Sequence, residues 1–227
     1  GASYPKWSGR CDNCGQWNTL LEQTQESIGK SAVSRSSNSG KILTPQNLKD
    51  VSASSKQVRF STGIKDLDVV LGGGVLPAGV LLIAGQPGIG KSTLLMQISG
   101  YVAKNQTVLY VSGEESAEQV ALRAARLGAS DAPNMQFASS TSADDIAATI
   151  RDSKHDLVIV DSIQTLAMDE ISSAPGTVSQ ITNSSNLIIQ AAKKSGAAVI
   201  LVGHITKEGS IAGPKTLEHL VDVVLNF

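Results

Sequence analysis

The sequence of 227 residues is poor in several residue types that build common kinds of site. Its three Phe, three Tyr and two Trp residues are too few for the repeated base-stacking platforms of an RRM-type sheet. Its two cysteines cannot form the disulfide framework of a small secreted protein. No apolar run approaches the roughly 20 residues of a membrane-spanning helix, and no signal-peptide pattern is present. We therefore expect a cytoplasmic protein with no membrane partner.

The charges are balanced, because 19 Lys and Arg residues face 20 Asp and Glu residues. A formal net charge of −1 excludes a uniformly basic coat, so any contact with nucleic acid must use local basic patches. Hydrophobic residues make up 41% of the chain, which is typical of a globular protein and argues against wholesale disorder.

The composition changes along the chain and predicts four segments. Residues 1–3 (Gly-Ala-Ser) are interpreted as a remnant of expression, since all three Met residues are internal. Residues 4–23 contain the Cys pair, and residues 24–57 are a Ser-, Lys- and Asn-rich linker. The surplus of basic residues in that linker either contacts phosphates or is simply solvated. Residues 58–227 form the main domain, and their abrupt end on an apolar strand suggests a piece of a longer protein.

From residue 58 onward, short apolar runs alternate with helical periods. Continuous apolar strands connected by helices are typical of an α/β domain with a parallel sheet covered on both faces. In such sheets, ligands bind beyond the carboxyl ends of the strands. The expected strands are 80–84, 108–111, 157–160, 197–202 and 221–225, and the expected helices are 92–103, 117–127, 143–153 and 178–194. Ser116 and Gln119 predict a capping box at the start of the second helix.

The strongest motif matches G-x-x-x-x-G-K-[ST] and lies between a predicted strand and a predicted helix. Its glycines allow successive backbone N–H groups to surround phosphate oxygens, and the helix N-terminus adds its positive dipole end. Lys91 is expected to reach the β- and γ-phosphates, and Ser92 to ligate Mg²⁺. The predicted nucleotide-binding residues are Gly85, Gln86, Pro87, Gly88, Ile89, Gly90, Lys91, Ser92 and Thr93.

Carboxylates stand at the ends of two further predicted strands. Asp161 ends the run 157–160, so it is the expected Walker B residue that holds Mg²⁺ through water, and Ser162 could bond to the same shell.

Glu114 and Glu115 follow the run 108–111, which we expect to lie next to the P-loop strand. Either carboxylate could polarise an attacking water. Alternatively, the pair could simply lie at the start of a helix, where negative charges interact favourably with the helix dipole. We favour catalysis and choose Glu114, because it comes first off the strand.

His204 follows the apolar run 197–202 and could sense the γ-phosphate for the loop that comes after it. An isolated histidine in such a position is more often structural. The loop 205–216 contains Lys207 and Lys215 together with two glycines. This composition fits either a loop that contacts DNA phosphates or an ordinary surface loop.

Cys11 and Cys14 form a Cys-x-x-Cys pair, which is half of a zinc ribbon. Two more ligands are needed to close the site, but the three histidines all fall in the main domain. If residues 1–3 replaced native sequence, the other Cys pair was cut away. The site is therefore incomplete, and we do not expect zinc to be bound.

Together these features resemble the RadA (Sms) family of bacterial DNA-repair and recombination ATPases, relatives of RecA, the DnaB-type helicases and KaiC. The resemblance covers nearly the whole chain after Ser3 and is highly specific when its motifs are taken together. It rests on residues 7–17, 61–63, 71–75, 85–93, 110–116, 160–164, 202–209 and 212–215.

The resemblance implies a RecA-like P-loop core that uses ATP and Mg²⁺ and assembles into hexameric rings around single-stranded or branched DNA. It implies branch migration of recombination intermediates, with a recombinase as partner. The family's full form also carries a four-Cys zinc finger, a Lys-Asn-Arg-Phe-Gly motif and a Lon-protease-like domain. This chain departs from that form at both ends. We therefore expect weak hexamer formation and slow hydrolysis with retained ADP, because a neighbouring subunit's cation would be missing.

Two function classes remain open. The first is a motor core whose ATP hydrolysis is stimulated by single-stranded DNA. The second is a nucleotide-gated module for DNA binding or assembly, in which hydrolysis is minor. A P-loop kinase is a distant third, because no Arg-rich lid is evident. The rate of phosphate release with and without DNA separates the first two.

Overall fold

A computed structural model describes residues 44, 45, 47, 58–152, 155–204 and 214–227. The chain divides into two units, Gly1–Val51 and Ser52–Phe227, and nearly all of the described residues belong to the second. Several predictions lie outside the described residues: the expression remnant 1–3, the zinc-ribbon segment with Cys11 and Cys14, the loop residue Lys207 and the side chain of Lys215. Most of the predicted linker lies outside them as well.

The described part of the second unit is built on a six-stranded sheet in the order β3-β2-β4-β5-β1-β6. Every pair of neighbouring strands is parallel, which confirms the predicted parallel sheet. The strands are β1 Val80–Gly85, β2 Val108–Ser112, β3 Met135–Ser139, β4 Leu157–Asp161, β5 Ala198–His204 and β6 Val223–Asn226.

Two features of the sheet differ from the prediction. The strand β2 does not lie next to the P-loop strand β1, since β4 and β5 lie between them. The strands β4 and β5 come later in the sequence than β1 and β2, yet they lie between them in the sheet. The order of the apolar runs along the chain does not reveal this arrangement. The edge strand β3 was missed, because its residues are only partly buried or exposed and its apolar pattern is correspondingly weak.

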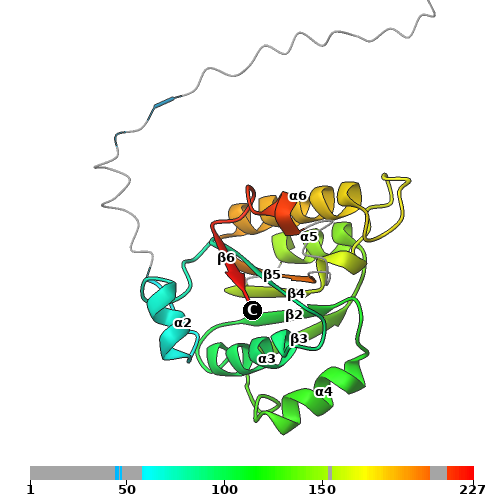
Figure 1. Ribbon diagram of the computed structural model, residues 1–227. Helices are drawn as coiled ribbons and strands as arrows, with labels where there is room; N and C mark the ends of the chain where they lie inside the picture. Colours follow the sequence, from blue (N-terminus) through cyan, green and yellow to red (C-terminus); the bar gives the residue numbers. More distant parts are fainter. Residues whose placement is uncertain (1–43, 46, 48–57, 153–154, 205–213) are drawn as a thin grey trace, which may run out of the picture. The chain divides into compact units, whose positions relative to one another are not determined.

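Helices cover both faces of the sheet, as predicted (Figure 1). The helices α3 Lys91–Val102 and α4 Ala117–Arg126 lie on one face. The helices α5 Ala143–Asp152 and α6 Val178–Ser195 lie on the other. Shorter elements are α2 Lys65–Val70, η1 Ile163–Thr165 and α7 Pro214–Leu217. Among the described residues, no helix is both long and apolar enough to cross a bilayer.

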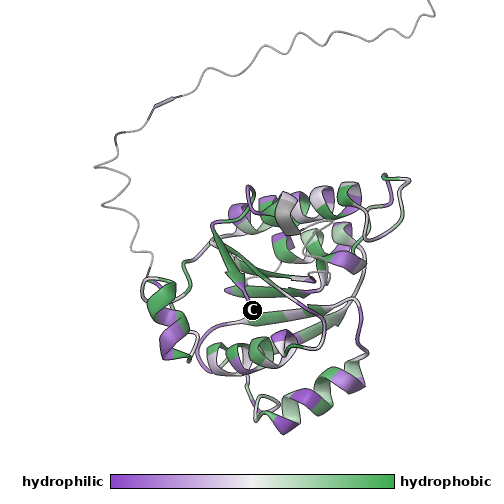
Figure 2. Ribbon diagram, viewed as in Figure 1, coloured by the Kyte–Doolittle hydropathy of each residue, from purple (hydrophilic) through white to green (hydrophobic). Residues whose placement is uncertain are grey.

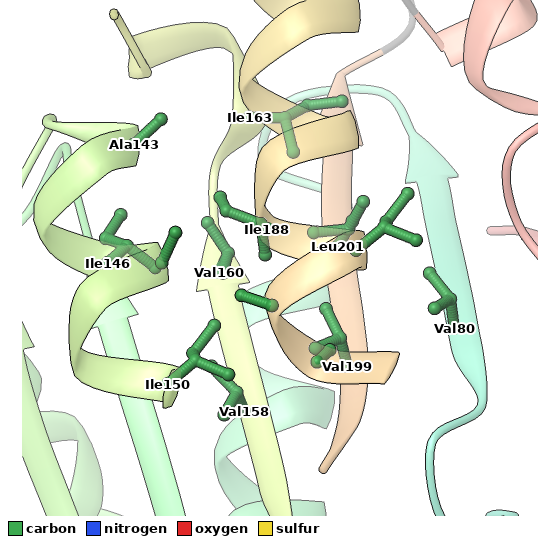
Figure 3. Close-up of a cluster of buried hydrophobic side chains, with 14 of the residues drawn as sticks. Val80, Ala143, Ile146, Ile150, Val158, Val160, Ile163, Ile188, Val199 and Leu201 are labelled. Carbon is green, nitrogen blue, oxygen red and sulfur yellow. The ribbon is translucent and has the colours of Figure 1, made fainter. Parts of the chain in front are cut away.

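The core consists of two layers because successive strand residues point to opposite faces. In β1, Val80 and Leu82 pack on the side of α5 and α6, whereas Leu81 and Ile83 pack on the side of α3. Figure 3 shows the first layer, in which isoleucines of α5 and α6 point at valines of β4 and β5. Figure 2 shows these strands as mostly hydrophobic. Each such side chain contributes about 1.5–3 kcal/mol to folding when it is fully buried.

Local signals set the start of α4 and the end of α6. The predicted capping box is present: the Ser116 hydroxyl accepts a hydrogen bond from the Gln119 N–H, and the Gln119 side chain accepts one from the Ser116 N–H. The helix α6 ends at Gly196, whose φ of 85° is the left-handed conformation that glycine adopts without strain. These caps hold the helices at the lengths that the sheet requires.

Candidate functional site

The P-loop joins the end of β1 to the start of α3, at the carboxyl edge of the sheet. Gly88 and Gly90 have φ values of 76° and 113°, which only glycine adopts readily. Gly90 is the N-cap of α3, and no side chain caps the first turn of this helix. The backbone N–H groups of that turn are therefore free of side-chain acceptors, and together with the helix dipole they favour an anion.

Lys91 is only 3% exposed and lies folded back against the loop. Its Nζ donates hydrogen bonds to the Gly85 carbonyl at 2.8 Å and to the Gln86 carbonyl at 2.9 Å. Burial lowers the pKa of its ammonium group, while the charges of Asp161 and Glu114 act in the opposite direction. An ammonium has three donors, so one N–H remains for a phosphate oxygen.

Asp161 ends β4 and is 6% exposed. The strand register places it beside Ser112 of β2. One of its carboxylate oxygens accepts a hydrogen bond from the Tyr110 hydroxyl at 2.7 Å. Burial and the neighbouring Asp161 charge raise the pKa of Tyr110, which keeps its hydroxyl protonated as a donor. Sequence analysis did not single out Tyr110, although the hydroxyl of a tyrosine inside a buried strand must find a partner.

The two adjacent glutamates have different partners. Glu114 Oε1 accepts a hydrogen bond from the Ser162 hydroxyl at 2.5 Å, and it lies 3.3 Å from His204 Nε2. Glu115 forms a two-pronged ion pair with the guanidinium of Arg123 on α4. Glu115 is thus committed to a structural pair, while Glu114 faces the phosphate-binding side of the site. This geometry supports the choice of Glu114 over Glu115 as the base.

His204 ends β5 and pairs in register with Gly85, so it stands directly beside the start of the P-loop. Its backbone carbonyl accepts a hydrogen bond from the side-chain amide of Gln164 at 3.3 Å. Gln164 lies in η1, just after Asp161, and sequence analysis assigned it no role. The end of β5 is therefore tied both to Glu114 and to the segment that follows Asp161.

The oxygen donors at this edge fit a magnesium ion. Ser92 is the second residue of α3 and Asp161 ends β4, and both carry the hard oxygen ligands that Mg²⁺ prefers. Mg²⁺ usually keeps several waters and takes further ligands from phosphates, so it needs few protein ligands. Among the described residues, no cluster of three or more His, Cys, Asp or Glu side chains could hold a metal by itself.

The hydrogen bond from Tyr110 to Asp161 leads to a testable prediction. Tyr110→Phe removes one donor from the carboxylate and leaves the ring in the core. Loss of such an outer-shell partner typically lowers metal affinity or activity by about 10- to 100-fold. We expect ATP turnover to need correspondingly more Mg²⁺, while ATP binding without Mg²⁺ is unchanged. Titration of turnover with Mg²⁺ tests this, and Tyr101→Phe on the exposed end of α3 is the control. An unchanged Mg²⁺ dependence would show that Tyr110 only packs.

Comparisons with known proteins show the family to which the chain belongs. A protein-family profile described as "AAA domain" matches residues 44–210. DNA repair protein RadA of Pseudomonas aeruginosa is 45% identical over 227 residues, which is 100% of this chain and 49% of the relative. DNA repair protein RadA of Brucella abortus is 46% identical, and that of Bacillus subtilis is 43% identical, each over 100% of this chain and 50% of the relative. The chain thus spans about half the length of the curated relatives it matches.

Proposed function

The chain belongs to the AAA-domain family of P-loop ATPases and is similar along its whole length to RadA proteins, and from this premise we propose that it couples ATP hydrolysis to single-stranded DNA in DNA repair. The observation that carries the proposal is the meeting of Glu114, Ser162 and His204, with the Glu114 charge acting on Lys91. These residues come from three different strand ends, and His204 pairs with the first residue of the P-loop.

Each residue has a distinct role in the proposed hydrolysis. The P-loop N–H groups and Lys91 hold the phosphates and offset the negative charge that develops on the γ-phosphate. Ser92 and Asp161 would hold Mg²⁺, which would supply positive charge against the phosphates when bound. Glu114 orients and polarises the attacking water. The Ser162 hydroxyl holds Glu114 in place, because a carboxylate that accepts a short hydrogen bond has little rotational freedom.

His204 would report the state of the γ-phosphate. It contacts Glu114 through its ring and Gln164 through its backbone, and the segment that follows it contains Lys207. A change at the γ-phosphate would therefore reach the end of β5 through the contact of His204 with Glu114. Lys215 follows that segment in the sequence and belongs to α7. We propose Lys207 and Lys215 as phosphate contacts to single-stranded DNA.

The names of these relatives specify DNA repair alone, and the rest of the proposal comes from the resemblance to the family. It assigns a hexameric ring, branch migration of recombination intermediates, a recombinase partner and a cytoplasmic location. It also assigns a cation from a neighbouring subunit to the hydrolysis step. The second candidate remains a nucleotide-gated DNA-binding or assembly module. The contacts of His204 favour it as much as the first, because a sensor also works without rapid turnover.

The Lys207→Ala/Lys215→Ala double variant tests the DNA part of the proposal. We expect ATP turnover without DNA to stay as in the wild type and stimulation by single-stranded DNA to disappear. DNA affinity should fall for all sequences, and its salt dependence should flatten by about 0.7 per lost contact.

The matched control is Lys193→Ala/Lys194→Ala, which removes two exposed lysines near the amino end of β5. Equal stimulation and an equal salt slope in the first double variant would contradict the assigned contacts. Tight DNA binding by the wild type without any stimulation of turnover would favour the nucleotide-gated module.

A further inference from the structure

The strand β6 borders the P-loop on the side away from the catalytic carboxylates. It pairs with β1 in a register that places Ala84 beside Asn226. Phe227 follows, and its N–H donates a hydrogen bond to the Ala84 carbonyl at 2.8 Å. This bond fixes the Phe227 backbone next to the first residue of the P-loop.

Phe227 contacts both ends of the P-loop. A Cβ placed on Gly85 would lie 2.9 Å from the Phe227 carbonyl oxygen and 3.1 Å from its Cβ, so only glycine fits there without movement. A Cβ placed on Gly90 would lie 3.9 Å from Cε1 of the Phe227 ring. The ring therefore lies near the N-cap of α3, which places a large apolar side chain beside the P-loop.

The strand order sets the direction in which a nucleotide crosses this loop. The γ-phosphate must face Asp161 and Glu114, which follow β4 and β2. Both strands lie on the β5 side of β1, whereas β6 lies on the opposite side. The phosphates occupy the P-loop between them, so the ribose and base extend toward β6.

We propose that the ring of Phe227 forms an apolar wall for the base of the bound nucleotide. This assignment rests on the binding of ATP at the P-loop. An aromatic ring stacks on the face of a base and does not read its hydrogen-bonding edge. Phe227 would thus add affinity for adenine and guanine nucleotides alike, and it would add none for a ligand that has phosphates alone.

Binding of two ligands separates this role from a role in shaping the loop. Calorimetric titration in the presence of Mg²⁺ measures the Kd of a non-hydrolysable ATP analogue and the Kd of inorganic tripolyphosphate. For Phe227→Ala we expect the Kd of the ATP analogue to rise roughly 5- to 150-fold, as the loss of base–aromatic stacking predicts. The Kd of tripolyphosphate should not change. Phe227→Trp should restore the analogue's affinity, and its fluorescence should respond to the analogue but not to tripolyphosphate.

Leu122→Ala on α4 is the matched control, because it removes an apolar side chain that is 72% exposed and remote from the P-loop. An equal loss of affinity for both ligands in Phe227→Ala would overturn the proposal, since Phe227 would then act on the loop. An unchanged Kd for the ATP analogue would overturn it as well. Failure of the wild type to bind either ligand would overturn the P-loop assignment itself, and this proposal with it.

Discussion

Glu114→Gln is expected to lower ATP turnover by about 10²- to 10⁴-fold, the range that general-base catalysis contributes. The amide keeps the size of the side chain and can still interact with the Ser162 hydroxyl, but it cannot polarise a water. Lys91 and the P-loop N–H groups are untouched, so nucleotide affinity should stay close to that of the wild type. Steady-state phosphate release and calorimetric titration with an ATP analogue measure the two quantities.

The neighbouring carboxylate provides the matched control. Glu115→Gln disturbs the ion pair with Arg123, whose side chain is 17% exposed. Such partly exposed pairs contribute up to about 1 kcal/mol, so the free energy of unfolding should fall slightly while turnover is kept. If Glu115→Gln alone abolished turnover, the roles of the two glutamates would be reversed.

Lys91→Ala should abolish measurable ATP turnover and weaken nucleotide binding. It removes the buried ammonium that we expect to face the β- and γ-phosphates, and loss of one such stabilising donor costs about 10²- to 10³-fold in rate. It also leaves the Gly85 and Gln86 carbonyls without their donor, which loosens the loop. Both effects act in the same direction, so the loss of turnover should exceed that expected from the lost donor alone.

Lys104→Ala is the control for Lys91→Ala. It removes an exposed cation just beyond the other end of α3, where Lys104 lies over the Tyr101 ring. Turnover and nucleotide affinity should stay at the wild-type level in this variant. Unchanged affinity and turnover in Lys91→Ala itself would refute the assignment of the P-loop.

Much of the fold could be predicted because strands that are buried on both faces appear in the sequence as continuous apolar runs. The runs that became β1, β2, β4 and β5 are apolar at every position, since helices cover each face of the sheet. The edge strand β3 has no such mark, because it has only one neighbouring strand and its residues are less buried. The wrong placement of β2 beside β1 arose because the apolar runs do not specify the strand order.

The local sequence determined which residues could be predicted from one loop or one strand end. The glycines, Lys91 and Ser92 of the P-loop fall within nine consecutive residues, so the motif by itself predicts their roles. Asp161 was predicted for a similar reason, because a carboxylate that directly follows a buried strand lies at the ligand-binding edge of the sheet, and the structure places it at the end of β4.

Only the tertiary structure decided which partners each of these residues has. Glu114 and Glu115 are alike in sequence, but Ser162 and His204 lie at the first carboxylate while Arg123 binds the second. The contacts of Tyr110 with Asp161 and of Phe227 with the P-loop likewise join residues from separate strands. Hydrogen bonds and van der Waals contacts act over a few ångströms in space, and the parallel sheet brings together strand ends that the chain separates by its crossover helices.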